Sequence, residues 1–123
     1  MMNNHLIVFI AGLAGAAGVA LSAAATHGGG IFTGTAASFL LAHAGVLVAL
    51  GLFTANRTLH AAGLILIAGL ILFCGDLLMR DYVGTRLFPF AAPIGGTLLM
   101  AGWLAIALAA LRSQKSSSQT SNS

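Results

Sequence analysis

Four long apolar stretches, separated by short polar breaks, make up most of this chain. A helix crosses the hydrocarbon core of a bilayer with about 20 mostly apolar residues, since the core is about 30 Å thick and each residue rises about 1.5 Å. Stretches of this kind cover residues 6–25, 35–55, 59–79 and 90–111. The pattern therefore predicts an all-α fold, an integral membrane four-helix bundle with short loops, in one domain over residues 1–112.

The breaks between the stretches are short. Three glycines, Gly28–Gly30, follow His27 and are expected to end the first helix, because glycine has a large entropy cost within a helix and favours the tight caps that end one. The longest loop is expected at Arg80–Pro89. Residues 113–123 are Ser, Gln, Thr, Asn and one Lys, with nothing to bury, so they are predicted to form a disordered polar tail.

The composition agrees with a membrane protein and excludes a soluble domain. Hydrophobic residues make up 59% of the 123 residues and charged residues 6%, whereas soluble domains contain about 45–50% apolar and about 25% charged residues. The formal net charge of +3 is too small for a nucleic-acid-binding surface. The single cysteine, Cys74, permits no disulfide within one chain.

Lysine and arginine near the ends of the spans predict the orientation, because cytoplasmic loops carry an excess of them. With four spans, both termini lie on the same side as Arg57, Arg112 and Lys115, and the other side carries Arg80 and Arg86. This bias favours termini in the cytoplasm, and the expected location is a bacterial inner membrane.

Two ionisable residues lie within the spans. Asp76 has Arg80 four residues later on the same helical face, so it forms either an interfacial ion pair or a proton or cation site. His43 lies about 12 Å below the start of its span, where it either bonds a backbone carbonyl or hydroxyl, or carries protons or binds metal. A metal site needs several converging ligands, and no spacing motif supports one, so no metal is expected.

The antiparallel spans place polar residues in the non-cytoplasmic half of the bundle. Ionisable residues within a membrane face the protein interior or a wet cavity far more often than lipid. We therefore predict a polar pocket open to the non-cytoplasmic face, with Asp76 paired to Arg80 and His43 at the floor. The candidate pocket residues are His27, His43, Asp76, Arg80, Pro93, Gly95 and Gly96.

Several short motifs, in their order along the chain, resemble a known family. They are Ala25–Gly28 (Ala-Thr-His-Gly), His43, Phe73–Leu77 (Phe-Cys-Gly-Asp-Leu), Ala92–Gly96 (Ala-Pro-Ile-Gly-Gly) and Gly102-Trp103. The order is similar to the YgdD-like family, domain-of-unknown-function family 423, which is also similar to eukaryotic transmembrane protein 256. The resemblance covers roughly Leu6–Leu111 and implies a small multi-spanning membrane protein with no established activity.

This sequence departs from the family pattern in the third span. Cys74 and Asp76 stand where the family has serines. The resemblance therefore implies no family-wide acidic role for Asp76.

Three classes of function remain open. We rank first an accessory membrane protein that binds a partner or lipid, and second a small-solute or ion transporter or channel acting as an oligomer. An enzyme ranks last, because catalysis needs a nucleophile or base oriented by a second group, and we expect no catalytic residue and no cofactor. The expected partner is the lipid bilayer, and a homo-oligomer or a larger membrane complex stays open.

Overall fold

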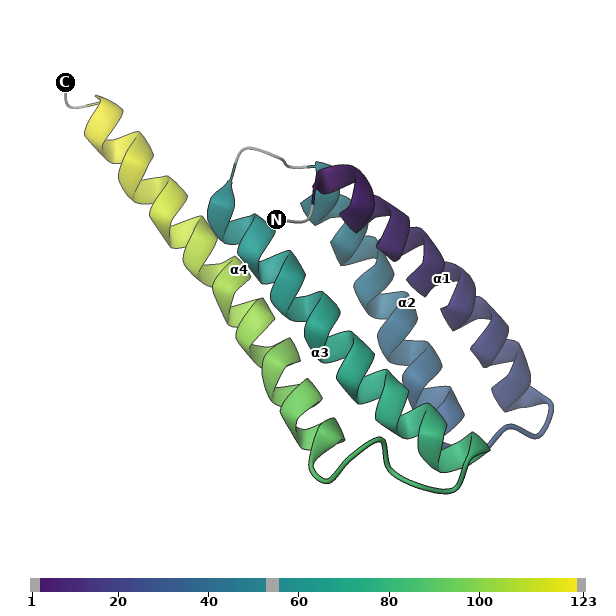
Figure 1. Ribbon diagram of the computed structural model, residues 1–123. Helices are drawn as coiled ribbons and strands as arrows, with labels where there is room; N and C mark the ends of the chain where they lie inside the picture. The colour runs from purple at the N-terminus through teal and green to yellow at the C-terminus, as the bar shows by residue number, and fades with distance from the viewer. Residues whose placement is uncertain (1–2, 53–55, 122–123) are drawn as a thin grey trace.

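The computed structural model describes residues 3–52 and 56–121, with the backbone alone described for 113–121. Within these residues the chain forms four α-helices and no strands. They are α1 (Asn4–Thr26), α2 (Ile31–Leu52), α3 (Arg57–Tyr82) and α4 (Ala91–Ser121), and they run alternately in opposite directions (Figure 1). All four are long and apolar enough to cross a membrane, so the predicted all-α membrane architecture is confirmed.

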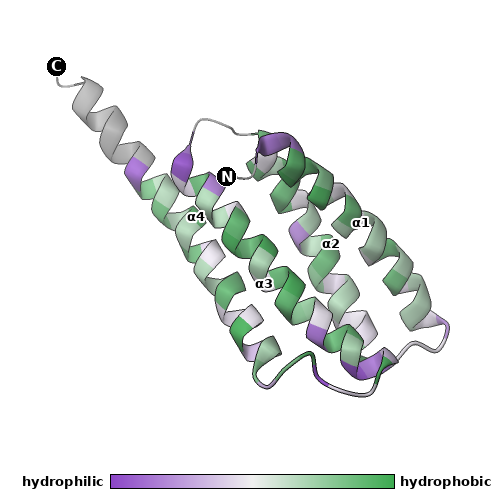
Figure 2. Ribbon diagram, in the orientation of Figure 1, coloured by the Kyte–Doolittle hydropathy of each residue, from purple (hydrophilic) through white to green (hydrophobic). Residues whose placement is uncertain are grey.

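The helices pack as two hairpins. Helix α1 packs against α2, α3 packs against α4, and the two hairpins meet through α2 and α3, so that α1 and α4 take the outer positions (Figure 1). Ile7, Leu47 and Leu66 are fully buried in the core. Apolar residues also cover the outer faces of the helices (Figure 2), which is the pattern of helices surrounded by lipid rather than water.

The α3–α4 pair approaches at backbone distance. A Cβ atom at Gly69 of α3 would lie 2.8 Å from the carbonyl oxygen of Gly95 and 2.9 Å from the backbone nitrogen of Leu99. A Cβ atom at Gly95 would lie 2.5 Å from the backbone nitrogen of Phe73. Small residues allow such close crossings in membranes, where the helices gain little from hydrophobic burial.

Asparagine side chains define the starts of two helices. Asn3 accepts a hydrogen bond from the N–H of Leu6 at 2.8 Å, and Asn56 accepts from the N–H groups of Thr58 at 2.9 Å and Leu59 at 3.2 Å. These bonds satisfy N–H groups that lack partners within the helix.

Two boundaries at the same end of the molecule differ from the sequence prediction. Helix α2 begins at Ile31 rather than 35, because the turn needs a positive φ only at Gly28 (φ 102°) within the glycine run. Helix α3 continues to Tyr82, so Arg80 lies in its last turn, and the connection to α4 is 83–90 rather than Arg80–Pro89. The predicted end of the second span, residue 55, lies outside the described residues.

Helix α4 also differs from the prediction. Its candidate span ends at Arg112, close to the predicted residue 111, but the helix continues to Ser121. The backbone of 113–121 is therefore helical, where the sequence predicts a disordered tail. This segment contains neither Pro nor Gly, the two residues that stop a helix most effectively, so a helix that has already formed can extend through it.

Candidate functional site

Asp76 and Arg80 form an ion pair near the end of α3. Arg80 Nη2 lies 2.8 Å from Asp76 Oδ2, with the aspartate side chain fully buried and the arginine side chain 22% exposed. The backbone N–H of Leu87 donates to Asp76 Oδ1 at 2.8 Å, and the guanidinium lies 5.3 Å from the ring centroid of Phe32. The predicted i, i+4 pair is present, and its carboxylate also holds the 83–90 connection against α3.

The geometry of this ion pair is that of charge attraction. Among the described residues, neither Asp76 Oδ2 nor Arg80 Nε has a partner with hydrogen-bond geometry. A buried carboxylate is costly unless an opposite charge is close. The nearby charge of Arg80 therefore explains how the buried carboxylate of Asp76 is tolerated within α3.

Asp81 binds the start of α2 and was not among the predicted site residues. Its Oδ2 accepts hydrogen bonds from the backbone N–H of Thr33 at 2.6 Å and from the Thr33 hydroxyl at 2.7 Å. A Cβ atom at Gly30 would collide with this carboxylate, so a larger residue there would displace the Asp81 side chain. A negative charge at a helix N-terminus is stabilised by the unpaired N–H groups and the helix dipole.

The sequence did carry one signal for Asp81. Gly30, which has no side chain, immediately precedes Ile31, so α2 lacks a capping side chain from its own segment. A capping group from elsewhere was therefore to be expected, and the chain has only two acidic residues to supply a carboxylate.

His43 belongs to a different cluster, in the middle of α2. Its Nδ1 lies 2.8 Å from the carbonyl oxygen of Phe39, and Trp103 Nε1 of α4 donates to its Nε2 at 3.2 Å. Because an indole N–H can only donate, Nε2 is the acceptor in this bond. The N–H is then on Nδ1, and it donates to the carbonyl oxygen of Phe39. Both ring nitrogens are thus bonded as in a neutral imidazole, which favours the interpretation of His43 as a core histidine.

The structure keeps the two clusters apart. Phe39 lies one turn before His43 on α2, Phe73 lies before Asp76 on α3, and their ring centroids are 4.5 Å apart. Because α2 and α3 are antiparallel, this aromatic pair lies between His43 and Asp76 along the bundle. The structure therefore brings Asp76 to Arg80 but does not bring His43 to them, and a pocket shared by all seven residues stays a prediction.

The other candidate residues lie at helix ends and crossings. His27 is the exposed C-cap of α1, and its N–H donates to the carbonyls of Ala23 and Ala24. Pro93 lies in the first turn of α4 and helps to line a cavity of about 470 Å³ on the outer face of that helix. Gly95 contacts the α3 backbone, and a Cβ at Gly96 would lie 3.9 Å from the Phe73 ring. Within the described residues no group of His, Cys, Asp and Glu could hold a metal ion.

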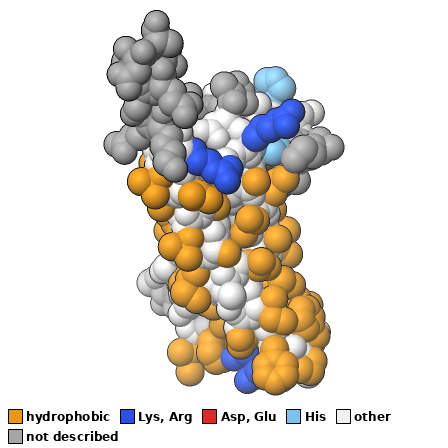
Figure 3. Space-filling view, turned by 90° about the vertical axis from the view of Figure 1, so that its left-hand side faces the viewer, with side chains coloured by type: hydrophobic (Ala, Val, Ile, Leu, Met, Phe, Trp, Pro, Cys, Tyr) orange, Lys and Arg blue, Asp and Glu red, His pale blue; other side chains and the backbone are white. Residues whose placement is uncertain are grey.

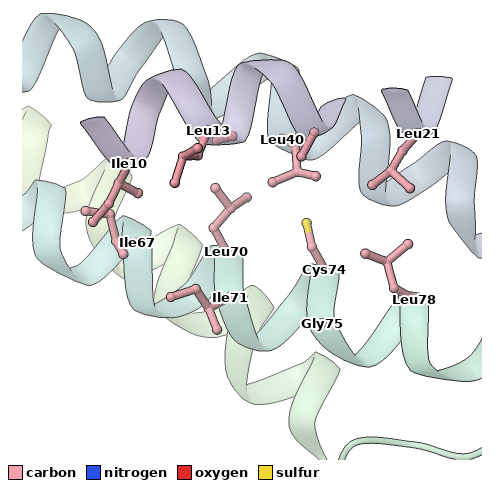
Figure 4. A pocket seen from close by; sticks show the side chains of 12 residues that line it. Ile10, Leu13, Leu21, Leu40, Ile67, Leu70, Ile71, Cys74, Gly75 and Leu78 are labelled. Carbon is pink, nitrogen blue, oxygen red and sulfur yellow. The ribbon is translucent and has the colours of Figure 1, made fainter. Parts of the chain in front are cut away.

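A groove between α1 and α3 was not predicted. It has a volume of about 310 Å³, and side chains of the two helices point toward one another across it (Figure 4). Leu13 and Ile71 on its rims are 56% and 64% exposed, so the groove is open to the outside of the molecule. Apolar side chains dominate the lining, which includes Ile10, Leu13, Ala17, Leu70, Ile71 and Cys74.

Comparison with known proteins places these features in a family. The family described as "Protein of unknown function (DUF423)" matches residues 12–96, which include all seven predicted pocket residues and the groove lining except Ile10. A UPF0382 membrane protein of Staphylococcus epidermidis strain RP62A is 29% identical over 79 residues, which are 63% of this chain. A UPF0382 membrane protein of strain ATCC 12228 has the same identity and coverage.

Both relatives are named as membrane proteins, in agreement with the four membrane-spanning helices. The match spans 65% of the length of each relative, just under two thirds. No solved structure matches the chain. The family match covers well over half of the chain and confirms the resemblance seen in the short motifs: the chain belongs to the DUF423 family of membrane proteins.

Proposed function

We propose that this DUF423 protein is a small lipid-binding membrane protein that holds one hydrocarbon chain of a lipid in the α1–α3 groove, without catalysis. The observation that carries the proposal is the groove itself, an open apolar cavity of about 310 Å³ between two membrane-spanning helices. Asp76 and His43, the residues best suited to acid–base chemistry, already have partners, which supports a non-catalytic role.

The size of the groove favours a hydrocarbon chain over a helix. From Ile10 to Leu21 the groove follows α1 for about 16 Å at the helical rise. A helix about 10 Å wide over this length occupies on the order of 1,200 Å³. A hydrocarbon chain that keeps carbon–carbon distances of about 4 Å occupies on the order of 260 Å³.

The chemistry of the lining also suits a lipid tail. The apolar rims formed by Leu13 and Ile71 face outward, so a chain can enter sideways from the bilayer. Lipid tails are as apolar as leucine, and binding inside a bilayer therefore depends on close packing rather than on escape from water. The small side chain of Ala17 and the Cys74 thiol let a chain approach the helices closely.

The proposed setting is a bacterial inner membrane with both termini in the cytoplasm. The basis is the excess of Lys and Arg on the terminal side, which carries Arg57, Arg112 and Lys115, over the other side, which carries Arg80 and Arg86. Reporter fusions at Asn56 and after Ser113 are expected to give cytoplasmic signals. A periplasmic signal at either position would contradict this orientation.

Photocrosslinking tests the groove directly. The full chain is reconstituted with a phospholipid that carries a diazirine in the middle of one acyl chain, and the adducts are mapped by mass spectrometry. We expect adducts to concentrate on Leu13, Ile71 and their groove neighbours. Ala17→Leu places a larger side chain in the groove and is expected to reduce these adducts several-fold.

The matched control is Ala16→Leu, which makes the same change at an exposed position of α1 outside the groove lining. This variant is expected to leave the adduct pattern unchanged. Adducts spread evenly over the lipid-facing surfaces, or an equal loss in both variants, would contradict hydrocarbon binding in the groove.

A further inference from the structure

We propose that Arg57 and Arg112 form a binding site for the phosphate of an anionic phospholipid at the terminal end of the bundle. The site lies at the membrane surface, not in the α1–α3 groove, and stands independently of hydrocarbon binding there. The site comprises Arg57, Arg112 and the Thr58 hydroxyl, which accepts a hydrogen bond from Arg112.

Both arginines lie at or beside the first turn of α3. Arg57 is the first residue of α3 and is exposed. Arg112 of α4 is also exposed, and its Nη1 donates to the hydroxyl of Thr58 at 3.4 Å. This hydrogen bond places Arg112 beside the first turn of α3, the turn in which Arg57 lies. Arg and His side chains are visible together at this end of the molecule (Figure 3).

No acidic side chain can neutralise this pair. The chain contains two acidic residues, Asp76 and Asp81. At the helical rise, Asp76 lies on the order of 30 Å along α3 from Arg57, well beyond the screening length of about 8–10 Å at physiological salt. Both carboxylates are also engaged locally, with Arg80 and with Thr33. The two exposed arginines are therefore available to an anionic ligand.

The position of the pair identifies a lipid as the source of that anion. The candidate spans are bounded by Arg57 and by Arg112, which places both guanidinium groups at the level of the headgroups. Guanidinium groups bind phosphate oxygens in bidentate fashion, and anionic leaflets attract basic residues next to a span.

Native mass spectrometry of the full chain in detergent tests the site. The protein is titrated with phosphatidylglycerol and, separately, with phosphatidylcholine of the same acyl chains. We expect phosphatidylglycerol to be retained in preference, and added salt to reduce the preference. Arg57→Gln and Arg112→Gln are each expected to weaken its retention about fivefold, since a basic residue near an anionic surface contributes about that factor.

The matched control removes a cation at the opposite end. Arg86→Gln lies in the exposed 83–90 connection and is expected to leave the lipid preference unchanged. Arg57→Lys with Arg112→Lys keeps the charge and is expected to retain most of the preference. Circular dichroism and thermal unfolding of each variant show that the fold is intact.

Three results would overturn the proposal. The first is an unchanged preference in the Arg57→Gln, Arg112→Gln double variant, and the second is an equal loss in Arg86→Gln. The third is displacement of phosphatidylglycerol by inorganic phosphate at equal concentration, which would assign the arginines to free phosphate. Should the double variant not fold, a preference of the unmodified chain that is insensitive to salt would also overturn it.

Discussion

Small residues lie on two sides of α3, in close backbone contact with α4 on one side and along an open groove on the other. On the side of α4, Gly69 and Gly95 let the two backbones touch, and a Cβ atom at either position would meet backbone atoms within 3 Å. On the side of α1, Gly75 and Cys74 line an open groove, and a Cβ at Gly75 would lie 3.8 Å from its nearest neighbour, Leu87. The first side holds the fold together, and the second leaves room for a ligand.

Helix α3, although rich in glycine, is therefore not uniformly packed along its length. Dispersion contacts fall away when partner atoms are missing on one side, so the close α3–α4 contact contributes stability that the groove does not. Changes on the closed side are therefore expected to lower the free energy of unfolding, and changes on the open side are expected to alter ligand binding with little effect on folding.

The largest effect on the closed side is expected from Asp76→Ala. The change leaves the charge of Arg80 and the N–H of Leu87 without their partner, and it releases the connection that leads into α4. Loss of one partner of a buried ion pair costs about 3 kcal/mol, measured as the free energy of unfolding in detergent.

The double variant Asp76→Ala, Arg80→Ala is the control, because it removes both charges together. It is expected to be less destabilised than the single variant. A double variant that is at least as unstable as Asp76→Ala would show that the ion pair does not hold this end of α3.

The next largest effect is expected from Gly95→Ala. Its Cβ would lie 2.5 Å from the Phe73 backbone nitrogen, so α3 and α4 must separate, at a cost of about 2 kcal/mol. Gly12→Ala on α1, where no neighbouring atom lies within 4 Å, is the comparison and is expected to cost nothing. Similar unfolding curves for the two variants would remove the distinction between closed and open sides.

A smaller effect is expected from His43→Phe. The change removes the acceptor of the Trp103 N–H, a bond that joins α2 to α4, and the net loss is about 1 kcal/mol. Trp103 is the single tryptophan of the chain, so its fluorescence emission reports on the bond. In a double-mutant cycle with Trp103→Phe, additive losses would show that the two side chains do not interact.

The smallest effect is expected on the open side, from Gly75→Ala. Alanine fits the space there and reduces the entropy that the helix loses on folding, so stability is expected to rise by about 0.5 kcal/mol. Gly69→Ala, six residues earlier on the same helix, is expected to lower it. Thermal unfolding of the two variants measures both changes in stability. A loss of stability in Gly75→Ala would mean that the groove is closed in the membrane.

The sequence was sufficient for the number and approximate position of the helices. A bilayer requires a fixed length of apolar helix, and this requirement is visible in the order of residues. The Asp76–Arg80 pair was also predictable, because residues four apart share a helical face whatever the helix packs against.

The features that depend on packing between helices were not predictable. Thr33 and Asp81 are 48 positions apart, and His43 and Trp103 are 60 positions apart, so no local spacing reveals either contact. The groove was missed for a different reason. Apolar residues cover all sides of these helices, and no amphipathic face distinguishes a side that packs against protein from one that faces lipid.

The bond between Asp81 and Thr33 has a consequence for how the chain assembles during synthesis. Thr33 leaves the ribosome 48 residues before Asp81, a delay of roughly 2 to 10 s at synthesis rates of about 5–20 residues per second. During this interval the first turn of α2 lacks its capping carboxylate, whereas α1 and α2 can already pair across their short connection. The first hairpin is therefore expected to enter the membrane with a frayed end, and the arrival of α3 completes it.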